Sequence, residues 1–280
     1  MSQGSASPQA PRVRIMGVVN VTPDSFSDGG RFLDPARAIE HGLQLVAEGA
    51  DLLDVGGEST RPGAAPLAPA EELRRVLPVL AGLREQSRVP LSIDTQQAEV
   101  AGAALDAGAT IVNDISAGRH DVRMLGLVAE RRAGFVAMHM QGNPRDMQRE
   151  PRYADVLAEV REFLRERIAA ALAAGVERAG LWIDPGIGFG KTLEHNLALL
   201  AGTHELAALG QPLLVGVSRK SFVAALEQRA GRASSAPAER LGGTLAASLF
   251  AARSGAAVLR VHDVAPLCQA LLVERALATR

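Results

Sequence analysis

Short apolar segments alternate with longer amphipathic segments along most of the chain. The short segments are rich in Val, Ile and Leu, and the segments that follow them repeat apolar residues with helical spacing, a pattern typical of a strand followed by a helix. The predicted strands are residues 13–20, 51–56, 90–94, 110–114, 134–140, 181–184, 212–217 and 258–263. The clearest predicted helices are residues 35–48, 69–86, 98–107 and 153–174.

These eight strand-then-helix units fill residues 13–280 and predict an α/β protein with one domain, a (β/α)8 TIM barrel. Several predicted helices end at a glycine, the usual C-terminal stop, at Gly49, Gly108 and Gly175. An open parallel sheet is the alternative, because the strands are apolar almost throughout in both architectures. Residues 1–12 are rich in Ser, Gln, Ala and Pro and lack periodicity, so we expect a disordered tail there.

Composition narrows the class of protein. The formal net charge is −1 and the sequence pI is about 6.6, which argues against nucleic-acid or anionic-membrane binding through a basic face. No apolar run reaches the ~20 residues that span a bilayer, and the N-terminus lacks the apolar core of a signal peptide. The single cysteine, Cys268, cannot form an intramolecular disulfide, so we expect a reducing, cytoplasmic location.

Polar or ionisable residues stand at the carboxyl ends of the predicted strands. They are Asn20, Asp54, Asp94, Asn113, His139, Asp184, Lys220, Arg260 and His262. In a barrel these ends and the loops after them form the working face. Each buried polar group costs about 1–3 kcal/mol if unpaired, so their recurrence predicts one polar ring at the barrel mouth. For any single carboxylate, a structural role as the partner of an arginine or as a helix cap competes about evenly with a role in a ligand site.

Four loops carry further signals. Residues 20–30 (NVTPDSFSDGG) and 56–63 (GGESTRPG) are longer than common strand-to-helix loops, so they fit substrate clamps or lids, and flexible surface turns are the alternative. The glycines of residues 184–191 (DPGIGFGK) allow close approach to a flat or phosphorylated ligand, but their spacing does not match an ATPase phosphate loop. Residues 216–221 (GVSRKS) contain Lys220, which with Lys191 makes up all the lysine among 30 basic residues.

Two chemical roles can be assigned to the polar residues. Arg61, Arg260, His262 and the Asn20 amide are suited to a phosphate or diphosphate accompanied by a divalent ion. Asp94, Asn113 and Asp184 with Lys220 are suited to the edge of an aminopyrimidinone such as a pterin or guanine, and the planar face of Arg260 is suited to stacking on such a ring.

The motifs resemble those of the dihydropteroate synthase family. MGVVNVTPDSFSDGG, GGESTRPG, SIDT, VNDIS, MHMQG, DPGIGFGK, GVSRKS and RVHDV occur in that family's order and at similar spacings, from about residue 13 to the C-terminus. The resemblance implies a (β/α)8 barrel, a homodimer, and a role in folate biosynthesis with Mg²⁺ as cofactor.

The resemblance also implies roles for individual residues. The pterin would be held by Asp94, Asn113, Asp184 and Lys220. Its slot would be lined by Met138, Phe189 and Gly216, with Arg260 stacked on the ring. Asn20, Arg61, Arg260 and His262 would bind the diphosphate, with Asn20 reaching the magnesium ion. Phe26, Thr60, Pro62 and Ser221 would border 4-aminobenzoate. The expected catalytic residues are Asp94, Lys220, Arg260 and His262, and Lys191 receives no role.

In the implied reaction, the arylamine of 4-aminobenzoate attacks the methylene carbon of (7,8-dihydropterin-6-yl)methyl diphosphate and displaces diphosphate. One alternative is a methyltransferase barrel that binds a pterin or methyltetrahydrofolate, although the chain lacks a second domain for a corrinoid. The other is a non-catalytic pterin-binding paralogue, which would have no need of the diphosphate residues.

Overall fold

Eight parallel strands form one sheet in the computed structural model, which describes residues 12–22, 34–59, 63–64 and 67–278. The strands are β1 (Arg14–Asn20), β2 (Leu52–Gly56), β3 (Leu91–Asp94), β4 (Ile111–Asp114), β5 (Gly134–Met138), β6 (Leu181–Asp184), β7 (Leu214–Val215) and β8 (Val258–Val261). Their order is β6-β5-β4-β3-β2-β1-β8-β7. A parallel bridge between Ile183 and Leu213 joins the two edge strands. The sheet therefore closes, which confirms the predicted barrel and excludes the open sheet.

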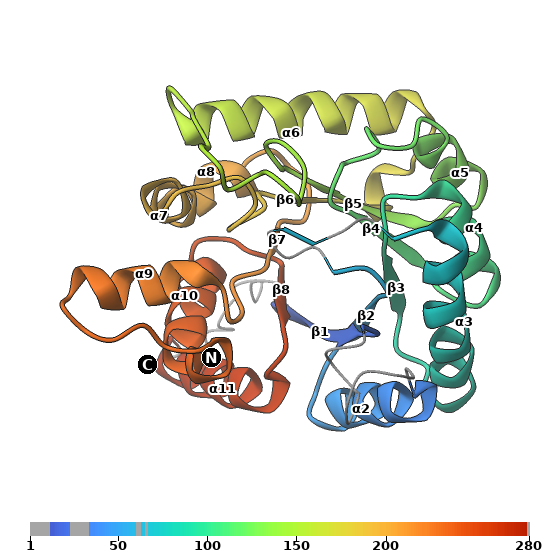
Figure 1. The fold of residues 1–280 in the computed structure, drawn as a ribbon, viewed down its shortest axis with the longest axis horizontal. Helices are drawn as coiled ribbons and strands as arrows, with labels where there is room; N and C mark the ends of the chain where they lie inside the picture. The colour runs from blue at the N-terminus through green and yellow to red at the C-terminus, as the bar shows by residue number, and fades with distance from the viewer. Residues whose placement is uncertain (1–11, 23–33, 60–62, 65–66, 279–280) are drawn as a thin grey trace, which may run out of the picture.

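Helices surround the sheet in Figure 1. They are α2 (Pro35–Ala47), α3 (Pro69–Gln86), α4 (Ala98–Asp106), α5 (Met124–Glu130), α6 (Val156–Ala173), α7 (Leu193–Ala201), α8 (Thr203–Ala207), α9 (Ser221–Arg229), α10 (Leu241–Arg253) and α11 (Val264–Ala278), with 3-10 turns η1 (Arg178–Gly180) and η2 (Pro237–Glu239). The predicted stops at Gly49, Gly108 and Gly175 follow their helices with positive φ. No helix of the described residues is long and apolar enough to cross a membrane.

Several predicted boundaries are corrected. The helix predicted from residue 153 begins at Val156, because the Asp155 side chain accepts a hydrogen bond from the Ala158 N–H and caps it. The strands predicted at 134–140, 212–217 and 258–263 are shorter: β5 ends at Met138, β7 spans only Leu214–Val215 and β8 ends at Val261. Arg12, which we assigned to the tail, pairs with Asp51 at 2.8 Å.

The alternation of side chains along the strands creates two cores. Outward-facing residues pack against the helices in the larger cluster. Inward-facing residues form a second cluster that fills the barrel: Met16, Leu52, Ile111, Val136, Trp182, Leu214 and Val258. At the amino end of the strands, the Arg14 guanidinium lies 4.4 Å from the Trp182 ring centroid and covers this layer. The inward-facing residues that come next along these strands, toward their carboxyl ends, therefore lie above this apolar cluster, which forms the base of the barrel mouth.

Candidate active site

Arg260 is the centre of a buried ion-pair network at the barrel mouth. Its Nε donates to Asp54 Oδ2 at 2.6 Å and its Nη2 donates to Asp94 Oδ2 at 2.8 Å. Asn113 Nδ2 donates to the same Asp54 oxygen at 3.0 Å. The Asp54 side chain is 0% exposed, whereas those of Asp94 and Arg260 are 13% and 22% exposed. Asp54 thus lies beneath the network and orients the groups that face the opening.

Asp184 begins a tightly folded loop, residues 184–191, which we call the glycine loop. Asp184 Oδ1 accepts a hydrogen bond from Gly186 N at 2.7 Å. Gly186 has a φ of +64°, and a Cβ at this position would lie 1.9 Å from the carbonyl oxygen of His139. Only glycine fits such a close approach in this backbone conformation. The loop therefore rests directly on the chain after β5, which fixes the Asp184 carboxylate.

Lys220 follows β7, the neighbour of β6, and lies against the glycine loop. Its Nζ donates to the Ile187 carbonyl and lies 4.8 Å from the Phe189 ring centroid. Phe189 packs on Met138 in a small apolar cluster, and a Cβ at Gly216 would lie 3.8 Å from Lys220 Nζ. Two of the residues predicted to line the pterin slot, Phe189 and Gly216, thus lie beside this ammonium, and Met138 belongs to the cluster against which Phe189 packs.

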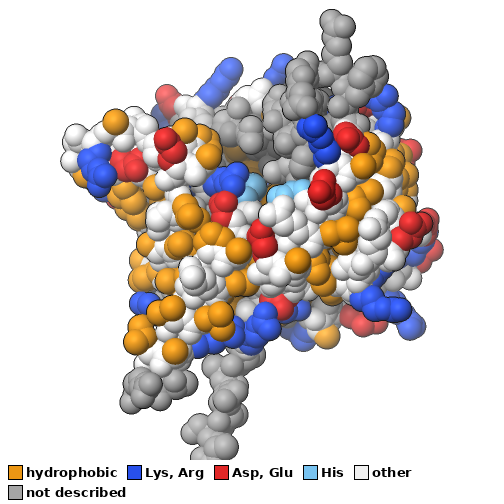
Figure 2. Space-filling model, turned by 90° about the horizontal axis from the view of Figure 1, so that it is seen from below, with side chains coloured by type: hydrophobic (Ala, Val, Ile, Leu, Met, Phe, Trp, Pro, Cys, Tyr) orange, Lys and Arg blue, Asp and Glu red, His pale blue; other side chains and the backbone are white. Residues whose placement is uncertain are grey.

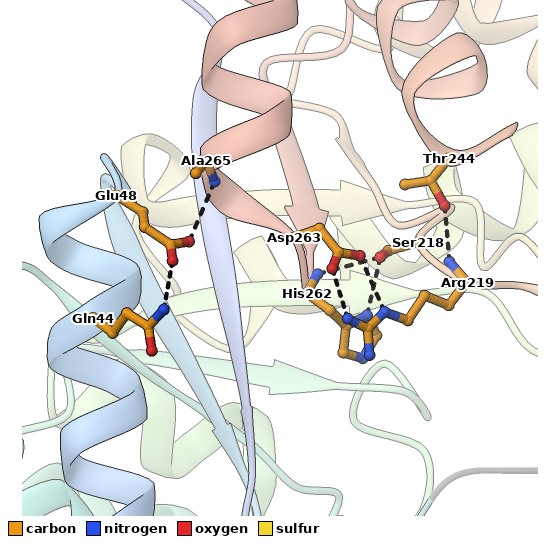
Figure 3. A network of polar contacts seen from close by, with 8 residues as sticks. All are labelled: Gln44, Glu48, Ser218, Arg219, Thr244, His262, Asp263 and Ala265. Atoms are coloured by element: carbon orange, nitrogen blue, oxygen red, sulfur yellow. Dashed lines mark hydrogen bonds and ion pairs between the residues drawn. The ribbon is translucent and has the colours of Figure 1, made fainter. Parts of the chain in front are cut away.

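The turn that carries Lys220 is fixed by its neighbour Arg219, as Figure 3 shows. Arg219 is a non-glycine residue with a φ of +60°, a conformation that needs support. Its guanidinium binds Asp263 at 2.6 and 3.0 Å, and its N–H donates to Thr244 Oγ1 at 3.0 Å. Arg240 Nη1 donates to its carbonyl at 2.9 Å. The turn that carries Lys220 is therefore held by side chains from three other parts of the chain, Asp263, Thr244 and Arg240.

The remaining described site residues lie around this turn. His262 Nδ1 is 3.0 Å from Ser218 Oγ, and Ser221 is the exposed first residue of α9. Asn20 ends β1, which pairs with β8, and strand alternation places Asn20 on the inward side together with Met16. Figure 2 shows histidine side chains at a hollow on this face, with charged side chains beside it.

His139 corrects the predicted polar ring. Its position continues the outward-facing set of Phe135 and Ala137, and its ring lies 4.7 Å from the Phe163 ring of α6. Its Nδ1 lies 3.0 Å from Lys191 Nζ, and both residues are buried. His139 therefore packs behind the glycine loop instead of joining the mouth. Because side chains alternate along a strand, the spacing of His139 from Phe135 and Ala137 could have shown that His139 faces outward, unlike the other strand-end residues.

Burial moves the pKa values of two carboxyl groups and one ammonium group of the site toward neutrality. It raises the pKa of Asp94 to about 7, against the attraction of Arg260 and with a contribution from the nearby Asp54. It also raises the pKa of Asp184, which Lys220 opposes. Burial lowers the pKa of Lys220 to about 8 despite Asp184. Such opposed shifts in one concave region are typical of functional sites.

Four predicted residues lie outside the part of the chain that the structure describes. They are Phe26, Thr60, Arg61 and Pro62. Their expected contacts with 4-aminobenzoate and diphosphate therefore remain predictions from the sequence.

Sequence reasoning gave no specific role to several residues that shape the site. Asp54 was placed in the ring, but the pairing that makes it the base of the Arg260 network depends on strands distant in sequence. Ser218, Arg219 and Asp263 were missed as positioning residues. Because side chains alternate along a strand, His262 is expected on the same side as Arg260 and Asp263 on the opposite, outward side. This alternation was the signal that could have indicated a separate role for Asp263.

Comparison with known proteins agrees with this geometry. The family described as pterin binding enzyme matches residues 16–262. A dihydropteroate synthase of Mycobacterium leprae is 50% identical over 262 residues, covering 93% of this chain and 92% of that protein. The methyltransferase alternative gains no support from these relatives.

Solved structures give the same result. A Xanthomonas albilineans dihydropteroate synthase with 4-aminobenzoic acid has a TM-score of 0.88 at 50% identity, covering 96% of this chain and 94% of that one. A structure of the synthase from that organism in complex with 7,8-dihydropteroate has a TM-score of 0.85 at 47% identity, covering 96% and 95%. With the barrel, the polar mouth and these relatives in agreement, the chain belongs to the dihydropteroate synthase family of pterin-binding enzymes.

Proposed function

We propose that this enzyme condenses 4-aminobenzoate with (7,8-dihydropterin-6-yl)methyl diphosphate to give 7,8-dihydropteroate and diphosphate. The observation that carries the proposal is the convergence of Asp94, Asn113, Asp184, Lys220 and Arg260 on one mouth above an apolar base. The two Xanthomonas albilineans structures hold 4-aminobenzoic acid and 7,8-dihydropteroate, which are one substrate and the product of this reaction, and so support the proposal.

The pterin is assigned to the space between the Arg260 network and the glycine loop. The carboxylates of Asp184 and Asp94 are suited to accept hydrogen bonds from the N–H edge of the ring. The Asn113 amide can both donate and accept, and the Lys220 ammonium can donate to the ring's acceptor atoms. Met138, Phe189 and Gly216 form the walls, and the Arg260 guanidinium offers a planar surface for stacking. Charge-assisted hydrogen bonds of this kind each contribute about 1.5–3 kcal/mol.

The diphosphate is assigned to Asn20, Arg61, Arg260 and His262. A resident metal cage is not formed here, because no three His, Cys, Asp or Glu side chains group around a possible ion within the described ranges. The Asn20 amide oxygen would hold Mg²⁺, since this ion keeps waters and binds through few protein groups. When bound, it would neutralise charge on the departing diphosphate.

4-Aminobenzoate is assigned to the outer part of the mouth. Ser221 supports this assignment because it is exposed at the start of α9 and follows Lys220 directly. Phe26, Thr60 and Pro62 are proposed as its other neighbours on the basis of the family resemblance.

The chemistry requires little proton transfer from the protein. The arylamine is neutral near pH 7, so its lone pair attacks the methylene carbon without a strong base. The N–C bond forms, the C–O bond to diphosphate breaks, and the amine releases one proton. Arg260 and His262 stabilise the leaving anion, while Asp94 and Lys220 hold the electron-rich ring through which the methylene carbon is stabilised. The transition state is expected to be dissociative.

The test is a coupled assay for diphosphate release from the pterin diphosphate. Release that depends on added 4-aminobenzoate, with Mg²⁺ present, supports the proposal. Binding of the pterin without release would identify a non-catalytic paralogue and overturn it.

Removal of Mg²⁺ with a chelator is expected to slow diphosphate release strongly in the same assay. Binding of a pterin, measured separately by calorimetry, should be unchanged, because the ion is assigned to the diphosphate alone.

We also propose that the enzyme is a homodimer formed through α7, α9 and α10. These helices border a groove of about 480 Å³ lined mainly by apolar side chains. Phe250 on its rim is 48% exposed, and Leu226 is 36% exposed. Hydrophobic side chains gather on the left side of Figure 2, the side on which α9, α10 and α11 lie in Figure 1. A net charge near zero places no strong repulsion between two copies, and an apolar surface of this kind favours association.

Phe250→Glu is expected to convert the dimer into a folded monomer, because it places a charge in the apolar interface. Light scattering coupled to size-exclusion chromatography measures the change. Val122→Glu is the matched control, since Val122 is 91% exposed but does not line the groove. A Phe250→Glu variant that remains dimeric would contradict this interface.

The cytoplasmic location is likewise proposed from the sequence. The only cysteine, Cys268, lies half-buried on α11 and is free. A chain with one free thiol is typical of a reducing compartment.

A further inference from the structure

Lys191 is a buried cation to which the proposed reaction gives no role. It is one of only two lysines in the chain, and the other, Lys220, lies in the pterin slot. Lys191 is 3% exposed. Because a buried ammonium without compensation costs several kcal/mol, its retention here needs a physical reason.

The Lys191 ammonium joins the glycine loop to the end of β5. Its Nζ lies 2.9 Å from the Phe189 carbonyl oxygen, 3.0 Å from His139 Nδ1 and 3.5 Å from the His139 carbonyl oxygen. His139 is held in turn by the Phe163 ring, edge to face at 4.7 Å. With Lys191 charged, His139 Nδ1 must be the acceptor, so the imidazole is neutral. Burial and the nearby Lys191 lower the pKa of His139 in agreement with this form.

The loop that Lys191 holds carries the pterin residues. Phe189 N donates to the Gly186 carbonyl at 3.0 Å, and Gly186 N donates to Asp184 Oδ1 at 2.7 Å. The Phe189 ring lies beside Lys220 Nζ. A loop released at Phe189 would therefore disturb both the Asp184 carboxylate and the ring that contacts Lys220.

The contacts require a compact cation with several donors. A methionine would fill similar volume but donate nothing to the two carbonyls and the imidazole. An arginine would bring a planar fork that is larger than the buried space and directs its donors differently. Burial lowers the pKa of Lys191 to about 7, and the attraction of Asp184 opposes this shift and so favours the ammonium form.

We propose that Lys191, acting through His139 and the Phe189 carbonyl, is a positioning residue that sets the geometry of the pterin subsite. The inference rests on the pterin assignment made above. It predicts an effect on the pterin substrate that 4-aminobenzoate does not share, because Ser221 and the outer mouth have no described contact with Lys191.

Lys191→Met is expected to raise KM for the pterin diphosphate by about 10–100-fold, in the range found when groups that orient binding residues are removed. KM for 4-aminobenzoate is expected to change less than about twofold. Calorimetry of pterin binding, on protein shown to be folded by circular dichroism, should give the same loss of affinity. His139→Leu removes the acceptor from the other side and is expected to give the same split, and the double variant should lose little more than either single one.

Arg14→Met is the matched control. It removes a cation from the closed end of the barrel, where Arg14 covers Trp182, and should lower Tm while leaving both KM values unchanged. The proposal is overturned if Lys191→Met and His139→Leu lower Tm with both KM values unchanged, or raise both KM values equally. If the unaltered enzyme releases no diphosphate, the proposed function fails, but the calorimetric comparison still decides the role of Lys191.

Discussion

Replacing Asp184 with alanine is expected to abolish pterin binding while the barrel stays folded. The carboxylate is buried at the end of β6, and within the described chain its only side-chain hydrogen bond is the one that it accepts from Gly186 N, so it retains acceptor capacity for the ring's N–H edge. Two charge-assisted hydrogen bonds lost at about 1.5–3 kcal/mol each correspond to a drop in affinity of roughly 10²–10⁴-fold. Isothermal calorimetry with a pterin ligand measures it.

Two comparison variants make the Asp184 result specific. Asp184→Asn keeps an acceptor oxygen without the charge, so its affinity should fall between those of the unaltered enzyme and Asp184→Ala. Lys220→Ala is expected to weaken binding without abolishing it. Unchanged pterin affinity in folded Asp184→Ala would show that the carboxylate only stabilises the glycine loop.

Replacing Arg260 with methionine is expected to have the largest effect on both stability and activity. The change leaves Asp54 and Asp94 buried near each other without their shared cation, and breaking a buried ion pair in this way costs about 3–5 kcal/mol. The pKa of Asp94, which burial already raises to about 7, should rise further. Activity should also fall steeply, because the guanidinium is proposed to serve both the pterin and the diphosphate.

The pH dependence of unfolding distinguishes this cause from a simple packing defect. A carboxyl whose pKa is raised in the folded state keeps a proton that the unfolded chain releases above about pH 4. The free energy of unfolding of Arg260→Met should therefore fall as pH rises from about 4 to beyond 7, more steeply than in the unaltered enzyme. Adding Asp54→Asn should restore part of the stability but not the activity. A pH dependence identical to that of the unaltered enzyme would contradict the explanation.

The barrel and most of its mouth were predictable because they follow from strong periodic signals. Strand-then-helix alternation gave eight strands, and polar residues inside apolar strands gave Asp94, Asn113, Asp184 and Arg260. These side chains stand inward because strand alternation continues the apolar layer of Met16 and Trp182.

What escaped prediction depends on exact strand ends and on contacts between distant segments. His139 was placed in the ring because its strand was predicted to run through residue 140, whereas β5 ends at Met138 and His139 continues its outward face. The contact of Lys191 with His139 joins residues 52 positions apart, and that of Arg260 with Asp54 joins residues 206 apart. No local pattern encodes such pairs.

The apolar base beneath the mouth has a consequence for ligand traffic. Met16, Trp182 and their neighbours fill the barrel and Arg14 covers them, so molecules can enter and leave only from the side of the loops. A ligand at Asp184 sits deeper than one beside the exposed Ser221. With the ligands assigned as above, we therefore expect the molecule at Asp184 to bind before the one at Ser221.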